Sequence, residues 1–296
     1  FFNAVKILVS CFMISDCAII KISDWCGDSI LIFGCNLITK YRRIQKLSKQ
    51  KSDQIHVFAL GGVGEIGKNM YVVEVNGNIF ILDAGLMFPE DEMFGVDLVI
   101  PDITYLTENK SRVKAIFLTH GHEDHIGALA YVLQKINVPV YGTKLTLGLA
   151  GELLKEANFN HRHDFRLIDP DMTVEIDDTL ITFFRVNHSI PDAVGICIHT
   201  SQGAVVYTGD FKFDQTPVDQ KHTEIAKLAA LGESGVLCLL SDSVNAENPG
   251  FTPSESMVGQ RIFKVIAESS GKVIIATFAS NIHRIQQVFT AVESCK

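Results

Sequence analysis

The chain of 296 residues is predicted to be an α/β protein with two packed β-sheets and helices on their outer faces. Short apolar runs of strand length recur along the chain, and helix-length segments separate some of them at 126–135 and 143–157. Several of the apolar runs end directly at His or Asp. An apolar content of 47% provides material for one large domain or two small ones.

The predicted strands begin after residue 54 and continue in short succession. Asn76-Gly77 joins two of them and is a strong signal for a two-residue hairpin turn. Four glycines at 61–67 match neither common phosphate-loop pattern, so we expect a loop whose backbone approaches the functional site. The predicted strands are 55–60, 70–75, 78–82, 113–118, 139–141, 165–169, 173–177, 179–187, 204–208 and 236–240. The three at 165–187 are expected to form an antiparallel run.

Charge and cysteine content limit the possible classes of protein. A formal net charge of −8 disfavours a simple electrostatic nucleic-acid binder, although a basic groove on an acidic body stays possible. The seven cysteines form no C-x-x-C pair, which disfavours a zinc ribbon, a redox dithiol and a disulfide framework. We therefore expect a cytoplasmic protein. No run reaches the roughly 18 apolar residues of a membrane span, and we assign no membrane role.

Residues 1–53 differ in composition from the rest of the chain. The sequence begins with Phe1 and not with Met. They carry eight Lys and Arg against four Asp and Glu, a net charge of +4, and the remainder, with 18 and 30, carries −12. Much of the positive charge lies in 40–51. We expect an atypical extension without a role in the chemistry; a targeting or membrane-associating leader and a nucleic-acid arm are the alternatives.

The segment 119–125 concentrates more chemistry than any other. It reads T-H-G-H-E-D-H and follows the predicted strand 113–118, at the kind of strand end where α/β sheets place their sites. Side chains alternate along an extended segment, so His120 and His122 should point to one side. Asp124 and His125 follow a short turn later. Imidazole and carboxylate are ligands of zinc, at about 2.0–2.2 Å.

This H-x-H-x-D-H pattern resembles the signature of the metallo-β-lactamase superfamily. The resemblance implies an αββα sandwich that holds one or two metal ions at one edge. The motif alone does not choose among lactam, thioester, phosphodiester and redox chemistry, because one fold and one metal cradle serve them all.

The resemblance implies roles for three more residues that follow predicted strands. Asp83 matches the first motif, in which such an Asp orients the metal ligands, although a turn role would also explain it. His188 follows an apolar strand. Asp210 lies in the T-G-D of the fourth motif, where a carboxylate can bridge two ions. We take the nearby Asp214 and Asp219 as surface residues.

The implied ligand set holds two divalent ions, zinc first, with Mn²⁺ or Mg²⁺ possible. The first ion would take His120, His122 and His188, the second Asp124 and His125, with Asp210 between them. Asp124 is also the expected protein partner of the attacking water. The family supplies one further His from a later motif, which neither His222 nor His283 matches.

Two later stretches, 236–255 and 272–287, resemble the β-CASP insertion of nucleic-acid-processing members of the superfamily. The second of them is expected to be a strand that turns into a helix. Together with 59–67 and 88–92 they are similar to the bacterial ribonuclease J family over about 55–294. That similarity implies 5′-to-3′ exonuclease and endonuclease action on RNA. It also implies a lactamase-like domain at 54–240 and the beginning of a β-CASP α/β domain at 241–296.

The residues around the last predicted helix, roughly 281–294, are candidates for RNA binding. Ser280 and Asn281 should cap the helix, whose free N–H groups can hold a phosphate. His283 and Arg284 would add contacts, the Arg as a charged fork. The alternative is an ordinary helix cap with a solvated Arg284. Asp242 matches the first β-CASP motif and would orient a metal ligand, or it is a simple strand-end Asp.

The leading hypothesis is therefore the N-terminal part of a zinc-dependent ribonuclease that acts in RNA maturation and decay. The family's chain continues beyond 296 residues, so we expect this chain to bind at least one metal ion and to be a weak or inactive nuclease alone. The full-length form would be a homo-oligomer or would assemble with other RNA-decay proteins. A small-molecule hydrolase of lactams or thioesters, and a non-catalytic RNA-binding subunit, are the alternatives.

Overall fold

The computed structural model describes residues 8–14, 17–23, 29–33 and 52–295. The chain separates into two compact units, Phe1–Ser52 and Asp53–Lys296. The predicted basic stretch at 40–51 lies outside the described residues. An antiparallel sheet makes up the described part of the first unit: β1 (Leu8–Ile14), β2 (Cys17–Ser23) and β3 (Ser29–Phe33).

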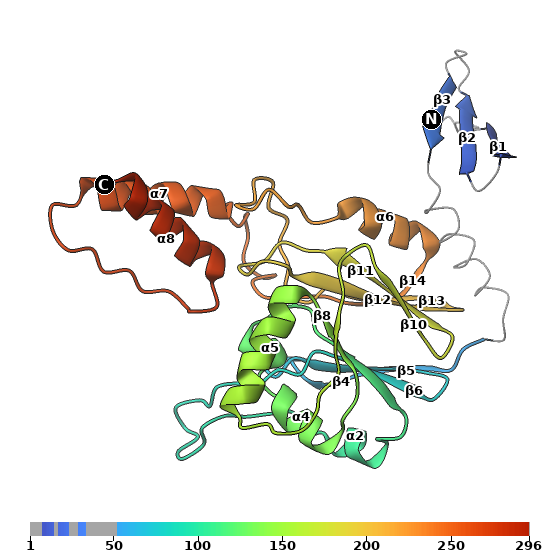
Figure 1. The fold of residues 1–296 in the computed structure, drawn as a ribbon, viewed down its shortest axis with the longest axis horizontal. Helices are drawn as coiled ribbons and strands as arrows, with labels where there is room; N and C mark the ends of the chain where they lie inside the picture. The colour runs from blue at the N-terminus through green and yellow to red at the C-terminus, as the bar shows by residue number, and fades with distance from the viewer. Residues whose placement is uncertain (1–7, 15–16, 24–28, 34–51, 296) are drawn as a thin grey trace. The chain divides into compact units, whose positions relative to one another are not determined.

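The second unit contains the predicted pair of sheets, and it is an α/β fold (Figure 1). The first sheet has the order β4-β5-β6-β7-β8-β9. Asn76 and Gly77 both have positive φ between β5 and β6, as a two-residue hairpin turn requires, so this predicted hairpin is confirmed. The strands are β4 (Ile55–Gly61), β5 (Met70–Val75), β6 (Asn78–Leu82), β7 (Val113–Phe117), β8 (Val140–Gly142) and β9 (Phe165–Leu167).

The second sheet has the order β10-β11-β12-β13-β14. Its first four strands are antiparallel neighbours, and the last pairs in parallel with β13. The strands are β10 (Thr173–Ile176), β11 (Thr179–Arg185), β12 (Val194–Thr200), β13 (Gly203–Tyr207) and β14 (Val236–Leu240).

The helices lie outside the two sheets, as predicted. Figure 1 shows α2, α4 and α5 beside the first sheet and α6 beside the second, while α7 and α8 pack against each other farther along the chain. Their bounds are α2 (Thr104–Glu108), α3 (Glu123–Ile126), α4 (Leu129–Lys135), α5 (Lys144–Glu156), α6 (Ile225–Ser234), α7 (Glu255–Glu268) and α8 (Ile282–Ser294). None of the helices among the described residues is both long and apolar enough to cross a bilayer.

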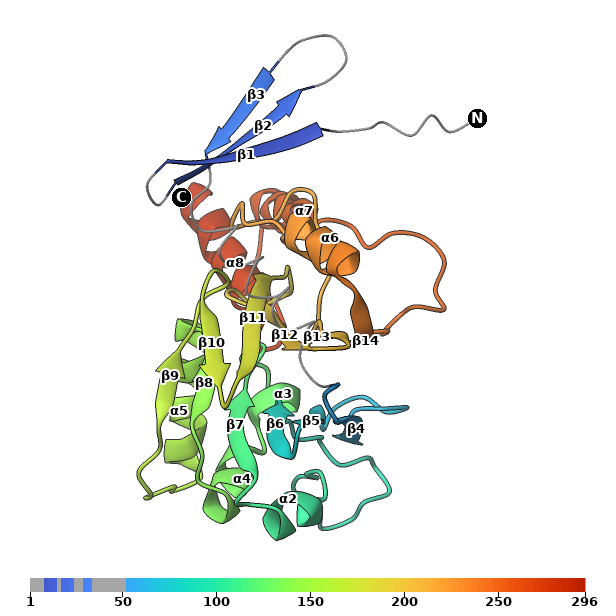
Figure 2. The same cartoon turned by 90° about the vertical axis from the view of Figure 1, so that its right-hand side faces the viewer.

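Aromatic side chains fill the space between the sheets. Phe117 of the first sheet lies with its ring centroid 4.9 Å from Tyr141 and 6.1 Å from Phe183 of the second sheet. All three are at most 5% exposed. Because side chains alternate along a strand, the opposite faces bury separate clusters, against α4 and α5 on one side and α6 on the other. The layers are therefore helix, sheet, sheet, helix (Figure 2).

Three predictions of local structure were wrong. The predicted antiparallel run includes β9, which instead joins the first sheet in parallel with β8. Residues 272–278 form no strand, because no partner strand lies beside them in the described part of the chain, and Ile274 is 86% exposed. The helix expected at 126–135 begins earlier, as α3, so Asp124 and His125 lie on a helical turn.

Candidate metal centre

The predicted site residues meet at one edge of the sandwich because their strands run in compatible directions. β6 and β7 are parallel, so Asp83 and the segment 119–125 both emerge at the carboxyl edge of the first sheet. β11 and β13 are each antiparallel to β12 and therefore share a direction, which brings His188 and Asp210 to one edge of the second sheet. The site thus draws side chains from both sheets.

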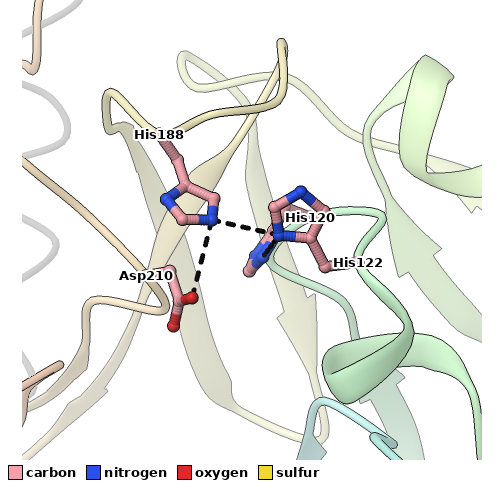
Figure 3. A group of neighbouring side chains, drawn as sticks. All are labelled: His120, His122, His188 and Asp210. Carbon is pink, nitrogen blue, oxygen red and sulfur yellow. Dashed lines mark hydrogen bonds and ion pairs between the residues drawn. The ribbon is translucent and has the colours of Figure 1, made fainter. Parts of the chain in front are cut away.

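Three imidazoles and one carboxylate form the first group. Figure 3 shows His188 and Asp210 facing His120 and His122 across the site. Nδ1 of His122 lies 3.2 Å from Nε2 of His120 and 3.1 Å from Nε2 of His188. The carboxylate Oδ2 of Asp210 lies 3.5 Å from Nε2 of His188. One potential ligand atom from each residue lies within 4.8 Å of the others.

The second group consists of Asp124, His125 and Asp210. Nε2 of His125 lies 3.2 Å from Oδ1 of Asp210 and 3.7 Å from Oδ2 of Asp124. Asp210 belongs to both groups, with one carboxylate oxygen toward each. The six residues predicted as ligands are therefore together, divided as the resemblance implied.

Asp83 anchors the groups from behind. Its side chain is fully buried, and its backbone has a positive φ of 61°. Oδ1 accepts a hydrogen bond from the backbone N–H of Thr119 at 2.8 Å, and Oδ2 accepts one from the Thr119 hydroxyl at 2.8 Å. The Tyr207 hydroxyl also donates to Oδ2 at 2.8 Å, and Nδ1 of His125 lies 2.7 Å away. These contacts fix the orientation of the His125 ring.

Burial and neighbouring charge set the protonation states. Burial lowers the pKa of His120 well below its ordinary value and that of His188 to about 3, so both rings are neutral at pH 7. Burial acts on His125 in the same direction, but the carboxylates of Asp83 and Asp210 outweigh it and raise its pKa well above the ordinary value. Burial raises the pKa of Asp210, yet contact with His125 outweighs burial and lowers it to about 2.

The first group fits a divalent cation better than it fits its own hydrogen bonds. Nδ1 of His122 faces two ring nitrogens, and a ring nitrogen carries either one proton or one lone pair. It cannot satisfy both neighbours when the rings are neutral. Imidazole with carboxylate is a donor set that zinc and other divalent transition metals accept, so these residues would hold a divalent cation through their lone pairs.

The loop that opens the body of the fold contributes a residue that the sequence alone does not single out. Nδ2 of Asn69 lies 3.1 Å from Nε2 of His125 and donates to the backbone oxygen of Asp124 at 3.1 Å. Asn69 ends the glycine-rich loop, so the predicted approach of this loop to the site is confirmed. Tyr207, on the inner face of β13, is a second such residue. No spacing in the sequence links either residue to Asp124 or Asp83.

The candidate RNA-binding residues lie in different surroundings. Burial lowers the pKa of His122, and the nearby Ser280 backbone opposes this by a smaller amount. Nε2 of His122 is buried without a hydrogen-bond partner in the described chain. Asn281 caps α8 and accepts from the Arg284 N–H at 3.3 Å. His283 lines a small cavity beside His188. Nε of Arg284 donates to Oε1 of Glu255 at 2.6 Å, so part of its charged fork is already engaged.

Two further acids lie beyond the two groups. Asp242 is half-buried, and its Oδ2 accepts from the backbone N–H of Phe211 at 3.4 Å, next to Asp210. Burial, with a smaller contribution from Asp210, raises its pKa. Asp214, expected at the surface, is only 6% exposed, and its carboxylate accepts hydrogen bonds from the backbone N–H groups of Thr216 and Glu255.

The fold and the ligand geometry agree with a match in sequence. Residues 63–230 match the sequence profile of the Metallo-beta-lactamase superfamily. The chain belongs to this superfamily. In this metallo-beta-lactamase-type protein, the two groups of side chains that could hold a metal lie at the edge where the two sheets meet.

The relatives of this metallo-beta-lactamase chain include ribonucleases. It is 55% identical over 245 residues to Ribonuclease J2 of Bacillus subtilis (strain 168), a match of 83% of this chain and 44% of the relative. It is 50% identical over 242 residues to Ribonuclease J 2 of Staphylococcus aureus (strain NCTC 8325 / PS 47), covering 82% and 43%. The chain thus spans less than half the length of these relatives.

Among solved structures, a protein of unknown function from Enterococcus faecalis V583 superimposes with a TM-score of 0.61 at 17% identity. The match covers 81% of this chain and 63% of that protein. At this identity the likeness concerns the fold alone.

Proposed function

We propose that this chain is the metal-binding part of a ribonuclease that hydrolyses RNA phosphodiester bonds, with 5′-to-3′ exonuclease and endonuclease action. The observation that carries the proposal is the convergence of six imidazole and carboxylate side chains from both sheets. The identity of 50–55% to proteins named ribonuclease J2 supports RNA as the substrate. Lactams and thioesters remain the competing substrates, because the metal cradle alone does not select among them.

The proposed cofactor is a pair of zinc ions, with Mn²⁺ or Mg²⁺ as alternatives. Bound divalent ions supply Lewis acidity and lower the pKa of a water to near neutrality. His120, His122 and His188 would hold one ion. Asp124 and His125 would hold the other, and Asp210 would contact both. The neutral state of His120 and His188 suits this role, because a protonated imidazole has no lone pair for a metal.

The remaining steps belong to the side chains themselves. The Asp124 side chain is 36% exposed, so water and a substrate phosphate can reach its carboxylate. We assign Asp124 the task of accepting the proton of the attacking water. Asp83 holds His125 in one orientation, and Asp242 holds the backbone beside Asp210. The latter two act through other residues and do not touch the substrate.

The proposal also covers the organisation of the whole protein. We assign 54–240 to the lactamase-like domain and 241–296 to the beginning of a β-CASP domain, with 1–53 as an extension outside the chemistry. Ser280, Asn281, His283 and Arg284 are proposed to contact RNA. We further propose work in the cytoplasm on RNA maturation and decay, as a homo-oligomer or together with other RNA-decay proteins.

The decisive experiment compares substrates on one preparation. The purified chain is stripped of metal, reloaded with Zn²⁺, Mn²⁺ or Mg²⁺, and incubated in excess over an end-labelled RNA, a chromogenic lactam and a thioester. We expect metal-dependent RNA cleavage with 5′-phosphate products and no turnover of the other two. The excess of protein allows a weak activity to be measured in a single turnover.

The matched control is the Asp124→Asn variant, which keeps the shape of the side chain and removes its charge. It should lose RNA cleavage while it retains the fold. Turnover of the lactam or the thioester without RNA cleavage would assign the chain to a small-molecule hydrolase. RNA binding without cleavage under any metal would leave a non-catalytic RNA-binding subunit.

A further inference from the structure

A second cavity opens at the edge of the sandwich that carries the metal centre. It encloses about 270 Å³, which suits a small ligand or one group of a larger one. β11 ends in its wall, α5 begins there, and the loop after β9 completes it. We call it the Arg185 cavity. Its polar lining consists of Thr143, Lys144, Asp169, Arg185, Asp192 and Lys221.

Arg185 is the central charge of this cavity. Ile181 and Phe183 of the same strand face the core between the sheets, and alternation places Arg185 on that face, at its mouth. Its backbone N–H and C=O are both bonded to Glu224, but its guanidinium has no ion pair or hydrogen bond within 52–295. Lys144 at the start of α5 is likewise unpaired within that range.

The two acids of the lining are already engaged. Oδ1 of Asp192 lies 3.6 Å from Nζ of Lys221. Oδ1 of Asp169 accepts backbone N–H groups from Asp171 and Met172 at 2.8 and 3.1 Å. Asp169 keeps its negative charge, so the lining, with three cations against two acids, carries a net charge of +1, and the side chains of Arg185 and Lys144 have no partner of their own within 52–295. An anion entering the cavity would therefore meet two cations without partners.

The cavity is continuous in its lining with the metal centre. A smaller cavity, lined by His188 and His283, shares Arg185, Asp192 and Lys221 with it. Only two residues separate Arg185 from His188 along the chain. A chain molecule with regularly spaced anionic groups can thus place one group at the metal centre and another in the Arg185 cavity.

We propose that the Arg185 cavity binds a phosphodiester group of RNA that flanks the group held at the metal centre. Guanidinium is the preferred partner of phosphate, because its N–H donors match two phosphate oxygens. This inference rests on the proposed function for the identity of the anion. Arg185 and Lys144 would bind the substrate directly, outside the two groups of candidate metal-binding side chains.

The test measures RNA binding apart from hydrolysis. A fluorescein-labelled single-stranded RNA hexamer is titrated with the metal-free chain at several salt concentrations, and its anisotropy is recorded. Arg185→Met should weaken binding about tenfold, the scale of a hydrogen bond to a charged group. The slope of log affinity against log salt should fall by about 0.7, the value for one phosphate contact on a single strand. Lys144→Met should act in the same direction.

Two controls remove the same charge elsewhere. Arg162→Met changes an exposed Arg before β9, and Lys110→Met an exposed Lys before β7; both should bind the hexamer like the unaltered chain. Arg185→Lys keeps the charge and should restore the salt slope, which separates a lost contact from a lost fold. Equal affinity and equal slope for Arg185→Met and Arg162→Met would overturn the proposal.

Inorganic phosphate distinguishes a small-anion site from an RNA site. If phosphate shifts the NMR signal of the Arg185 Nε–H and the hexamer does not displace it, the cavity binds small anions and the assignment to RNA is wrong. If Arg185→Met weakens hexamer binding but the metal-loaded chain cleaves no RNA, the cavity assignment stands and the proposed nuclease activity fails.

Discussion

Nδ1 of His125 lies 2.7 Å from Oδ2 of Asp83, and both side chains are at most 1% exposed. This contact turns the opposite nitrogen, Nε2, toward Asp210 at 3.2 Å. Histidines that bind metals commonly give their second ring N–H to a carboxylate, which fixes the tautomer and the ring orientation. The Asp83–His125 pair therefore orients Nε2 of His125 toward the second group. Because the pKa of His125 is raised, this nitrogen would have to release its proton when an ion binds.

Asp83→Asn tests this orientation. The amide keeps the size of the side chain but loses the negative charge that fixes His125. We expect one of the two ions to bind about 10- to 100-fold more weakly, because residues behind the ligands commonly have effects of this size. A competition titration with a chromogenic zinc chelator measures both affinities. Unchanged affinity for both ions would show that Asp83 does not position His125.

The metal-free chain should be most stable near the ordinary pKa of histidine. The pKa of His188 in the folded chain is about 3, so below about pH 6.5 the unfolded chain binds a proton that the folded chain does not bind. The free energy of unfolding therefore decreases as the pH is lowered below about 6.5. The raised pKa of His125 acts oppositely, since its contribution is present below about pH 6.5 and is lost as pH rises through the folded value.

Urea denaturation of the metal-free chain from about pH 4.5 to about pH 9 measures the free energy of unfolding on both the acidic and the basic side of this maximum. His188→Gln should lose less free energy of unfolding than the unaltered chain between about pH 6.5 and about pH 4.5, because its residue 188 cannot titrate. A stability that climbs steadily above pH 6.5 would contradict the assignment for His125.

His122→Ala should reduce the number of ions bound. Nδ1 of His122 faces both His120 and His188, so its removal opens the first group at its centre. The zinc content after dialysis, measured by mass spectrometry, should fall by one ion per chain. His161→Ala is the control, since it removes an exposed imidazole that packs on Phe159. Full zinc content in His122→Ala would refute the ligand assignment.

Gly85→Ala should disturb the second group through the backbone. A Cβ at residue 85 would lie 1.6 Å from the backbone oxygen of Asp124, which cannot move aside cheaply. We expect a loss of about 2 kcal/mol in the free energy of unfolding, as for other overpacked sites, together with weaker metal binding. Denaturant titration measures the first and chelator competition the second.

Gly148→Ala provides the opposite outcome in the same experiment. Its added Cβ meets nothing within 4 Å, and it lies inside α5. Alanine is favoured over glycine in a helix by about 1 kcal/mol, so this variant should gain stability and keep its metal affinity. Equal behaviour of the two variants would mean that Gly85 is not tightly packed.

The sequence predicts the strand ends well, because the polar ligands follow apolar runs directly. It does not predict β12, whose Gly195 is typical of an interrupted strand. In the fold, the ring of Phe184 occupies the place of the absent Cβ at Gly195, at 2.1 Å, so the glycine is a packing requirement. A single sequence contains no sign of that contact.

Strand pairing and contacts between residues that are distant in sequence also cannot be predicted from a pattern of residues. Residues 272–278 have the apolar character of a strand, yet a strand exists only where a neighbour accepts its hydrogen bonds. The contacts of Asn69 and Tyr207 depend on how two sheets meet. The resemblance to a known family supplies His188 and Asp210, because spacing alone does not connect either residue with the segment 119–125.

Because His120, His122 and His125 extend from one sheet and His188 and Asp210 from the other, an ion held between them would cross-link the two sheets. Its retention then reports on their alignment. A substitution at Phe117 or Phe183, which are buried between the two sheets, should weaken metal binding although it changes no metal ligand. The rate of ion release would then measure small shifts of one sheet relative to the other.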